Sequence, residues 1–488
     1  MSPCPAPPPL PSSLHLNPPR LPFTNHGQAL LAEFVGTAFL VIVTRLTTRA
    51  DVEQRYLALA MTLSALIYAF DHVSGAHFNP AVTLGMVASR RVRPVTGALY
   101  VLCQTLGGIA GGLFSHAVAS QTDFINVLPS PSGAGWAVEF LYTFALILVQ
   151  QNAGVEKNGQ EPNSYFGIAV AFTVLAGACA TFPISGGCFN PAVGTGVEFA
   201  ALFNTGAQPT GSLANLWLYW SAPLSGALVA TAVKWYQNLA SHRRAEDLPT
   251  VVPLTECVGT FFIVLTASLT SQPLAVGAML MGMVYMGDHV CGADFNPAVT
   301  LGVALRFGTP AAEWWKVAVT VMAQFVGAVG AAFAAYGIKG TVSLPVNPSQ
   351  ATDGLYGMVG YEALWTGLIV YVACAVMTPT SGEEEPGRER AGHSRSYQGL
   401  ALGFVVAGGI YGGSDSGGAG SGGVFNPALG SGIMLVQSTL GGGDASTLWV
   451  YWVGPLLGAL GGSTLFSLLH FHTDPFPQEE YEEPASFY

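Results

Sequence analysis

Charged residues are scarce in this chain: they make up only 9% of its 488 residues, whereas half of the residues are hydrophobic. Soluble domains usually carry about a quarter charged residues, so an ordinary water-exposed surface is excluded. Long apolar stretches recur instead, such as Trp136–Val149 with Glu139 as its one charge. With their flanks, these stretches are long enough to cross a bilayer. We therefore predict a multi-pass membrane protein.

An excess of basic residues, cysteine pairs at disulfide spacing and metal-ligand clusters are also lacking. The net charge of −11 leaves nothing basic enough to bind nucleic acid. The seven cysteines are odd in number and lack disulfide or metal spacing, and the histidines lack ligand spacing. Neither a metal nor another cofactor is expected. Because no hydrolase or kinase constellation is present either, we predict that the protein is not an enzyme.

Polar segments divide the chain into two large units. Residues 1–26 are proline-rich without the apolar core of a secretory signal, so we expect a disordered arm there. The first unit is expected at 27–240 and the second at 251–472, with a polar linker at 241–250. An acidic tail, which we expect to be solvated, follows at 473–488.

One string occurs four times along the chain: SGAHFNPAVTLG, SGGCFNPAVGTG, CGADFNPAVTLG and SGGVFNPALGSG. Upstream of each copy lies a second repeated string: AEFVGT, VEFLYT, TECVGT and YEALWT. The glutamates of these strings are Glu33, Glu139, Glu256 and Glu362. Copies one and three match best, as do copies two and four. The chain is therefore a doubled unit, and each unit consists of two diverged halves.

Each unit is expected to contain six membrane spans and two half-spans, which begin at the asparagines of the repeats. Because each half contains an odd number of spans, the second half must be inverted relative to the first. With both termini in the cytoplasm, most Lys and Arg residues, including Arg90, Arg91 and Arg93, fall on the inner side. This agrees with the positive-inside rule.

The Asn-Pro-Ala motif suits the start of a short helix buried in a membrane. Asparagine is a favoured N-cap, proline is favoured at the first helical position, and the helix start carries about half a positive charge. Irregular backbone at that depth must line a cavity or be buried in protein. We predict pores lined by Asn79, Pro80, Ala81, Asn190, Pro191, Ala192, Asn296, Pro297, Ala298, Asn426, Pro427 and Ala428. Such pores pass small neutral solutes and exclude protons and ions.

On these motifs, about residues 27–470 resemble the aquaporin, or major intrinsic protein, family. The resemblance implies an all-α membrane protein with two hourglass bundles in tandem, one pore in each. It also implies that the four repeat glutamates are buried acceptors for the re-entrant backbone. Family members assemble as tetramers, so a homo-oligomer of two such chains would supply four pores within the lipid bilayer.

The sequence departs from water-selective members of the family immediately after the second motif of each unit. Those members usually have an arginine there, where this chain has Val193 and Leu429. Projection by spacing gives two selectivity filters, with a four-residue insertion assumed for Ile410: Leu59, Ala178, Gly187 and Val193, then Val276, Ile410, Gly423 and Leu429. Both are uncharged and lack the N–H donors of arginine. We expect water and small neutral solutes such as glycerol, urea or ammonia to pass.

Four polar residues are expected at the pore mouths: His72, His77, His289 and Asp294. Cys188, two residues before Asn190, is expected close to the filter of the first unit.

Two functions other than a passive channel stay open. A twelve-span secondary transporter also has inverted repeats and broken helices, but usually carries several ionisable groups at its substrate site. The second alternative is a non-conducting or single-pore membrane scaffold, in which apolar filters are closed by dewetting.

Overall fold

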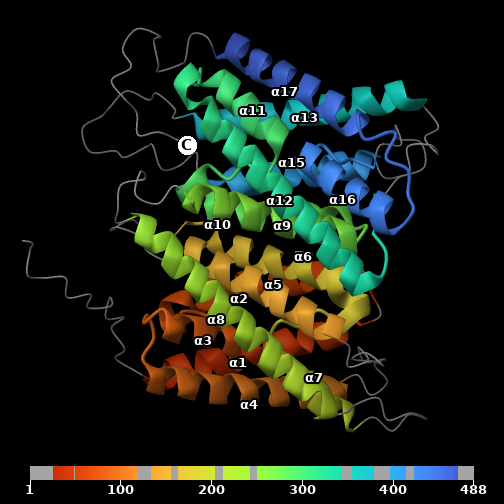
Figure 1. The fold of residues 1–488 in the computed structure, drawn as a ribbon. Helices are drawn as coiled ribbons and strands as arrows, with labels where there is room; N and C mark the ends of the chain where they lie inside the picture. Colours follow the sequence, from red (N-terminus) through yellow and green to blue (C-terminus); the bar gives the residue numbers. More distant parts are fainter. Residues whose placement is uncertain are drawn as a thin grey trace, which may run out of the picture.

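The computed structural model describes residues 26–48, 50–118, 133–154, 163–203, 213–241, 250–342, 344, 354–378, 396–413 and 422–470. Throughout these residues the regular structure is helical, with no strand. The expected arm, linker and tail therefore lie almost entirely outside the described residues. Figure 1 shows the helices stacked in layers, with the first unit in the lower half of the view and the second above it.

The first unit contains six long helices and two short ones. They are α1 His26–Leu46, α2 Val52–Ser74, α3 Pro80–Ala88, α4 Pro94–Val118, α5 Gly133–Ala153, α6 Phe166–Ser185, α7 Pro191–Ala201 and α8 Leu216–Ser241. The second unit repeats this order. Its helices are α9 Val251–Leu269, α10 Pro273–Cys291, α11 Pro297–Arg306, α12 Trp314–Lys339, α13 Gly354–Met377, α15 Gln398–Gly413, α16 Pro427–Leu440 and α17 Val450–Leu469.

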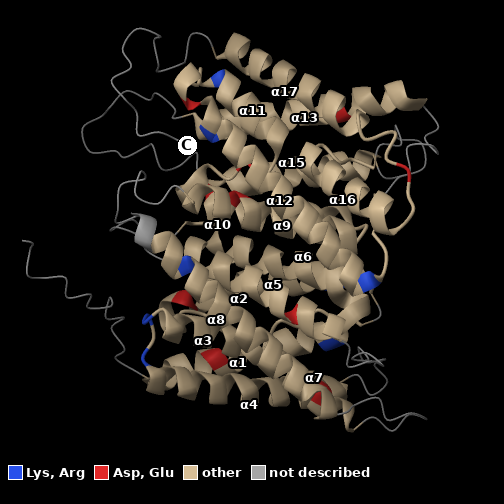
Figure 2. Ribbon diagram, in the orientation of Figure 1, with Lys and Arg blue, Asp and Glu red and all other residues tan. Residues whose placement is uncertain are grey.

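Among the described helices, 11 are long and apolar enough to cross a membrane. The remaining expected span, α15, is apolar but has only 16 residues. Figure 2 shows how few charged residues interrupt these helices, since most of the ribbon carries neither Lys, Arg, Asp nor Glu. These features confirm the predicted all-α membrane fold with two tandem bundles. They also confirm its four short half-helices.

Small residues let the helices approach closely, as expected where lipid gives no hydrophobic drive for helix association. A Cβ added to Gly108 of α4 would lie 2.3 Å from the carbonyl oxygen of Ala192, at the start of half-helix α7. Gly112, one turn later, meets the carbonyl of Gly196 in the same way. The glycines of α4 therefore position half-helix α7 within the first unit.

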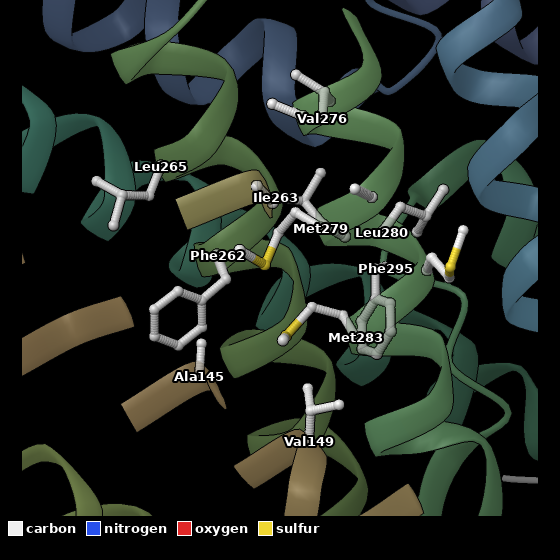
Figure 3. Packing of buried hydrophobic residues seen from close by; sticks show 14 of the residues in the cluster. Ala145, Val149, Phe262, Ile263, Leu265, Val276, Met279, Leu280, Met283 and Phe295 are labelled. Atoms are coloured by element: carbon white, nitrogen blue, oxygen red, sulfur yellow. The ribbon is translucent and has the colours of Figure 1, made fainter. Parts of the chain in front are cut away.

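The two units pack against each other through α5 and α6 of the first and α9 and α10 of the second. Phe144 stacks on Phe262 with ring centroids 5.6 Å apart, and the hydroxyls of Tyr142 and Thr266 are 3.1 Å apart. Figure 3 shows Phe262 beside Ala145 at this seam. Buried residues from both units thus form one continuous hydrophobic core.

Candidate functional site

Each half-helix begins in the same way, with an asparagine N-cap followed by proline at the first helical position. The side-chain oxygens of Asn79, Asn190, Asn296 and Asn426 accept from the N–H of the following alanine at 2.8, 3.0, 2.9 and 2.9 Å, respectively. In the second half-helix of each unit, the same oxygen also lies 3.3 Å from the next backbone nitrogen, that of Val193 or Leu429. Capping therefore uses the carbonyl end of each amide and leaves its NH₂ end pointing away from the helix.

The two asparagines of each unit bind the opposite segment reciprocally. Asn79 Nδ2 donates to the Phe189 carbonyl at 2.9 Å, and Asn190 Nδ2 donates to the Phe78 carbonyl at 2.8 Å. The second unit repeats this pair of hydrogen bonds: Asn296 Nδ2 donates to Phe425 at 2.8 Å, and Asn426 Nδ2 to Phe295 at 2.9 Å. The starts of the two half-helices in each unit are therefore fixed face to face.

The phenylalanine before each asparagine has an unusual backbone. Phe78, Phe189, Phe295 and Phe425 have φ angles of 50, 52, 52 and 52°, in the left-handed region that residues with a side chain seldom occupy. Strain of this kind persists only where the surroundings over-determine the conformation. Here it turns each phenylalanine carbonyl toward the asparagine of the opposite half-helix.

The four repeat glutamates supply part of that constraint. Their side chains are fully buried, and each accepts the N–H groups of its phenylalanine and of the residue before it. Glu139 accepts from Phe189 at 2.6 Å and from Cys188 at 2.9 Å. The corresponding pairs are Glu33 with His77 and Phe78, Glu256 with Asp294 and Phe295, and Glu362 with Val424 and Phe425. The carboxylates thus satisfy backbone donors that would otherwise be orphaned inside the membrane.

Glycines on the neighbouring helices hold the phenylalanine rings. A Cβ on Gly36 or Gly259 would lie 2.2 Å from the ring of Phe78 or Phe295. Gly177 and Gly409 make the corresponding room for Phe189 and Phe425. The motif analysis missed these phenylalanines, although Phe precedes Asn-Pro-Ala in all four copies and was the available signal.

A cavity of about 70 Å³ runs past the asparagines of the first unit. Three of the four projected filter residues line it: Leu59, Gly187 and Val193. Ala178 does not belong to this lining. It is buried behind the filter, with its Cα only 2.6 Å from where a Cβ on Gly187 would lie.

The corresponding cavity of the second unit measures about 280 Å³. All four projected filter residues line it, including Ile410, whose assignment had required an insertion: Val276, Ile410, Gly423 and Leu429. Asn296 and Asn426 also face this cavity. The two units therefore share one backbone plan but enclose spaces of different size.

The four expected pore-mouth residues separate into two pairs. His77 lines the first cavity and Asp294 lines the second. His72 and His289 are exposed in the last turns of α2 and α10 and belong to neither lining. Their expected place at the pore mouths stays a prediction.

Cys188 lines the first cavity beside the filter, and its sulfur lies 3.1 Å from the Asn190 carbonyl oxygen. The matching residue of the second unit, two positions before Asn426, is Val424. A thiol is therefore present at this position in the first unit and not in the second.

Paired half-helices inside a bundle of apolar helices define a channel-type membrane protein. The sequence pattern of the family "Major intrinsic protein" matches residues 22–234 and again 250–466. The chain belongs to this family and carries its domain twice. Family members of the aquaporin type are channels, so the chain is an integral membrane channel protein and not an enzyme.

Individual relatives each match about one unit. The chain is 32% identical to Glycerol uptake facilitator protein-like 6 of Lactiplantibacillus plantarum, over 41% of this chain and 93% of that protein. It is 30% identical to Aquaporin PIP2-7 of Musa acuminata, over 46% and 88%, respectively. A solved structure, the aquaglyceroporin from Plasmodium falciparum, matches with 20% identity and a TM-score of 0.39, over 45% of this chain and all of that one.

Replacement of a repeat glutamate tests its part in the site. In Glu139→Gln, an amide NH₂ replaces one of the carboxylate oxygens that accept from Ser185, Cys188 and Phe189. Leaving such buried donors unsatisfied costs about 1–3 kcal/mol each. We expect a clearly lower unfolding temperature in detergent, measured by intrinsic fluorescence. Glu313→Gln, at a partly exposed ion pair with Lys316, is the control. Equal unfolding temperatures for the two variants would contradict this role.

Proposed function

We propose that each unit forms its own passage for water and small neutral solutes such as glycerol, urea or ammonia. The observation that carries this proposal is the reciprocal pair of asparagine–carbonyl hydrogen bonds beside a cavity in each unit. An amide nitrogen has two N–H groups, and one is used in each of these bonds. The other is available to a solute in the passage.

This geometry accounts for exclusion of protons and cations. A water molecule that accepts from an asparagine N–H presents its oxygen to it, so it cannot belong to an unbroken hydrogen-bonded chain. The two helix starts that meet there each carry about half a positive charge, which repels cations. An apolar constriction also strips an ion of its hydration without replacing it. Neutral hydrogen-bonding solutes meet none of these barriers.

The filters favour a broad range of neutral solutes. Val193 and Leu429 add no charge, and Gly187 and Gly423 add no side chain to the lining. Each of the four repeat glutamates accepts hydrogen bonds from backbone N–H groups of a re-entrant segment. They are therefore committed to structure, which favours a passive channel over a secondary transporter.

Blocking one filter at a time tests whether both units conduct. Tryptophan at position 193 or 429 would fill the first or second cavity, respectively. In vesicles of purified protein, we expect each of Val193→Trp and Leu429→Trp to retain part of the water and glycerol flux, and the double variant to lose nearly all of it. Stopped-flow light scattering measures both solutes. A wild-type flux no greater than that of protein-free vesicles would favour the scaffold, and saturable flux would favour a transporter.

Cys188 provides a chemical block of the first passage alone. A mercurial bound to its sulfur would occupy a cavity of only about 70 Å³. We expect the reagent to abolish water flux in Leu429→Trp vesicles and to leave flux in Val193→Trp vesicles, because Val424 offers no thiol. Cys188→Ser in the Leu429→Trp background is the matched control. Inhibition that persists in this control would assign the block to another cysteine.

Two further features of the assembly belong to this proposal. With the termini in the cytoplasm, the loops that follow α3 and α11 face the cytoplasm.

Two copies of the chain would complete a ring of four passages, since the free faces of each copy match the faces that are already joined within the chain. Phe39 and Phe262 both lie six residues after a repeat glutamate, as do Leu368 and Ala145. Phe262 lies beside Ala145 (Figure 3), whereas Phe39 and Leu368 are 50% and 42% exposed.

A cysteine pair tests this arrangement of two copies. In Phe39→Cys/Leu368→Cys, the new thiols lie on faces of α1 and α13 that the proposed second copy would bring together. We expect a disulfide-linked dimer on non-reducing gels after mild oxidation in membranes. Phe39→Cys combined with Met322→Cys, which is exposed on α12, is the matched control. Equal cross-linking in both variants, or none in either, would contradict the proposed contact.

A further inference from the structure

The second passage differs from the first around one point, the residue two positions before the first asparagine of the unit. That residue is His77 in the first unit and Asp294 in the second. His77 is anchored: its Nδ1 lies 3.1 Å from the Thr83 hydroxyl, and its ring packs edge-on against Tyr100 at 5.4 Å. The imidazole is thereby held against the wall of the first passage.

Two further substitutions accompany Asp294. Tyr100 lies four residues before Gln104, and the matching residue before Gln324 is Thr320. The Tyr100 hydroxyl donates to the Ser74 carbonyl, and the position of Ser74 is taken by Cys291 in the second unit. The second unit thus has the smaller Thr320 in place of the Tyr100 ring and hydroxyl, next to the position where Asp294 replaces His77.

The Asp294 carboxylate is consequently a prominent polar group of its cavity. It is only 6% exposed, and among the described residues lining the second cavity it is the one ionisable side chain. The Thr300 hydroxyl lies within hydrogen-bonding reach. A carboxylate offers about four acceptor sites, so acceptor capacity remains for a molecule in the cavity.

The surroundings add to its attraction for a positive charge. The Asp294 N–H donates to the Glu256 carboxylate at 3.1 Å, which places a second carboxylate next to it. The thiols of Cys291 and Cys374 also lie near Asp294, and Cys374 is in turn close to the Arg306 guanidinium. The Glu256 and Asp294 carboxylates together attract a positive charge more strongly than either would alone.

We propose that Asp294 makes the second passage an entry site for small amines, which bind there as ammonium ions and cross as free bases. This rests on the proposed channel function and names one solute class for one of its passages. At the site, the proton moves from the ammonium nitrogen to a carboxylate oxygen: one N–H bond breaks, one O–H bond forms, and the electron pair stays on nitrogen. The neutral amine passes Asn296 and Asn426, and the proton returns to water on the entry side.

The test compares methylamine flux with water flux in vesicles of the full chain at neutral pH. A luminal pH dye records methylamine, because a free base that enters takes up a proton and raises the internal pH. The Val193→Trp variant isolates the second passage and Leu429→Trp isolates the first. We expect the methylamine-to-water ratio to be about tenfold higher in Val193→Trp, as charge-assisted hydrogen bonds are the strong ones. Asp294→Asn in that background should lower the ratio to the value of the first passage.

Three outcomes overturn the inference while leaving the channel intact: equal ratios for the two isolated passages, a ratio unaffected by Asp294→Asn, or methylammonium uptake without internal alkalinisation. Should Asp294→Asn lose both fluxes, Asp294→Glu decides, because it keeps the carboxylate. A restored high ratio supports the inference, and a ratio at the first-passage value overturns it. Absence of water flux from Val193→Trp would instead defeat the proposed function of the second unit.

Discussion

The structure depends on how each re-entrant segment satisfies its backbone inside the membrane. Such a segment leaves the helical path at a depth where water cannot pair its N–H groups, and each unpaired group costs several kcal/mol. One glutamate per half-unit meets this need with two acceptor oxygens. By holding the phenylalanine N–H, it also stabilises the left-handed backbone at that residue. The phenylalanine carbonyl then points at the opposite asparagine, so the position of one carboxylate determines the geometry at the centre of the passage.

This dependence explains why much of the architecture could be predicted from the sequence. Spans follow from apolar length, half-helices from Asn-Pro at a cap, and the inverted halves from an odd number of spans. Each is a local property of the chain. The glutamates could be assigned because each lies in a repeated string upstream of one of the motifs. The reciprocal hydrogen bonds, in contrast, join Asn79 to Phe189 and Asn190 to Phe78 across more than a hundred residues, and no local pattern indicates them.

The filter residues and the histidines show a second reason why part of the site could not be predicted from the sequence. Spacing places a residue along the chain but does not give the direction of its side chain. Gly187 was placed beside the first passage, while Ala178, projected to the same filter, lies behind it. His72 and His77 are five residues apart, yet only His77 lines the cavity, because α2 ends at Ser74 and the chain leaves the helical path at Gly75. Side-chain direction after a helix end is set by tertiary packing.

Duplication lets the two passages diverge without loss of this common frame. Tyr56 and Pro273 occupy matching positions, each 21 residues before the His77 or Asp294 position. The Tyr56 hydroxyl reaches the Gly186 carbonyl at 2.7 Å across the first cavity, whereas Pro273 begins α10 and has neither ring hydroxyl nor reach. The contrast between cavities of about 70 and 280 Å³ thus arises from wall residues that the glutamate–phenylalanine–asparagine frame does not use.

The join between the units gives this divergence a further consequence. A head-to-tail contact between non-identical faces can continue around a ring, and fusion makes one such contact intramolecular, with a high effective concentration. In the proposed pair of chains, the two kinds of passage would alternate, because every first unit is tied to its own second unit. Separate single-unit channels could assemble in any ratio. The tandem chain instead fixes equal numbers of narrow and wide passages, so changes at Asp294 or Tyr56 would alter half of the passages and spare the others.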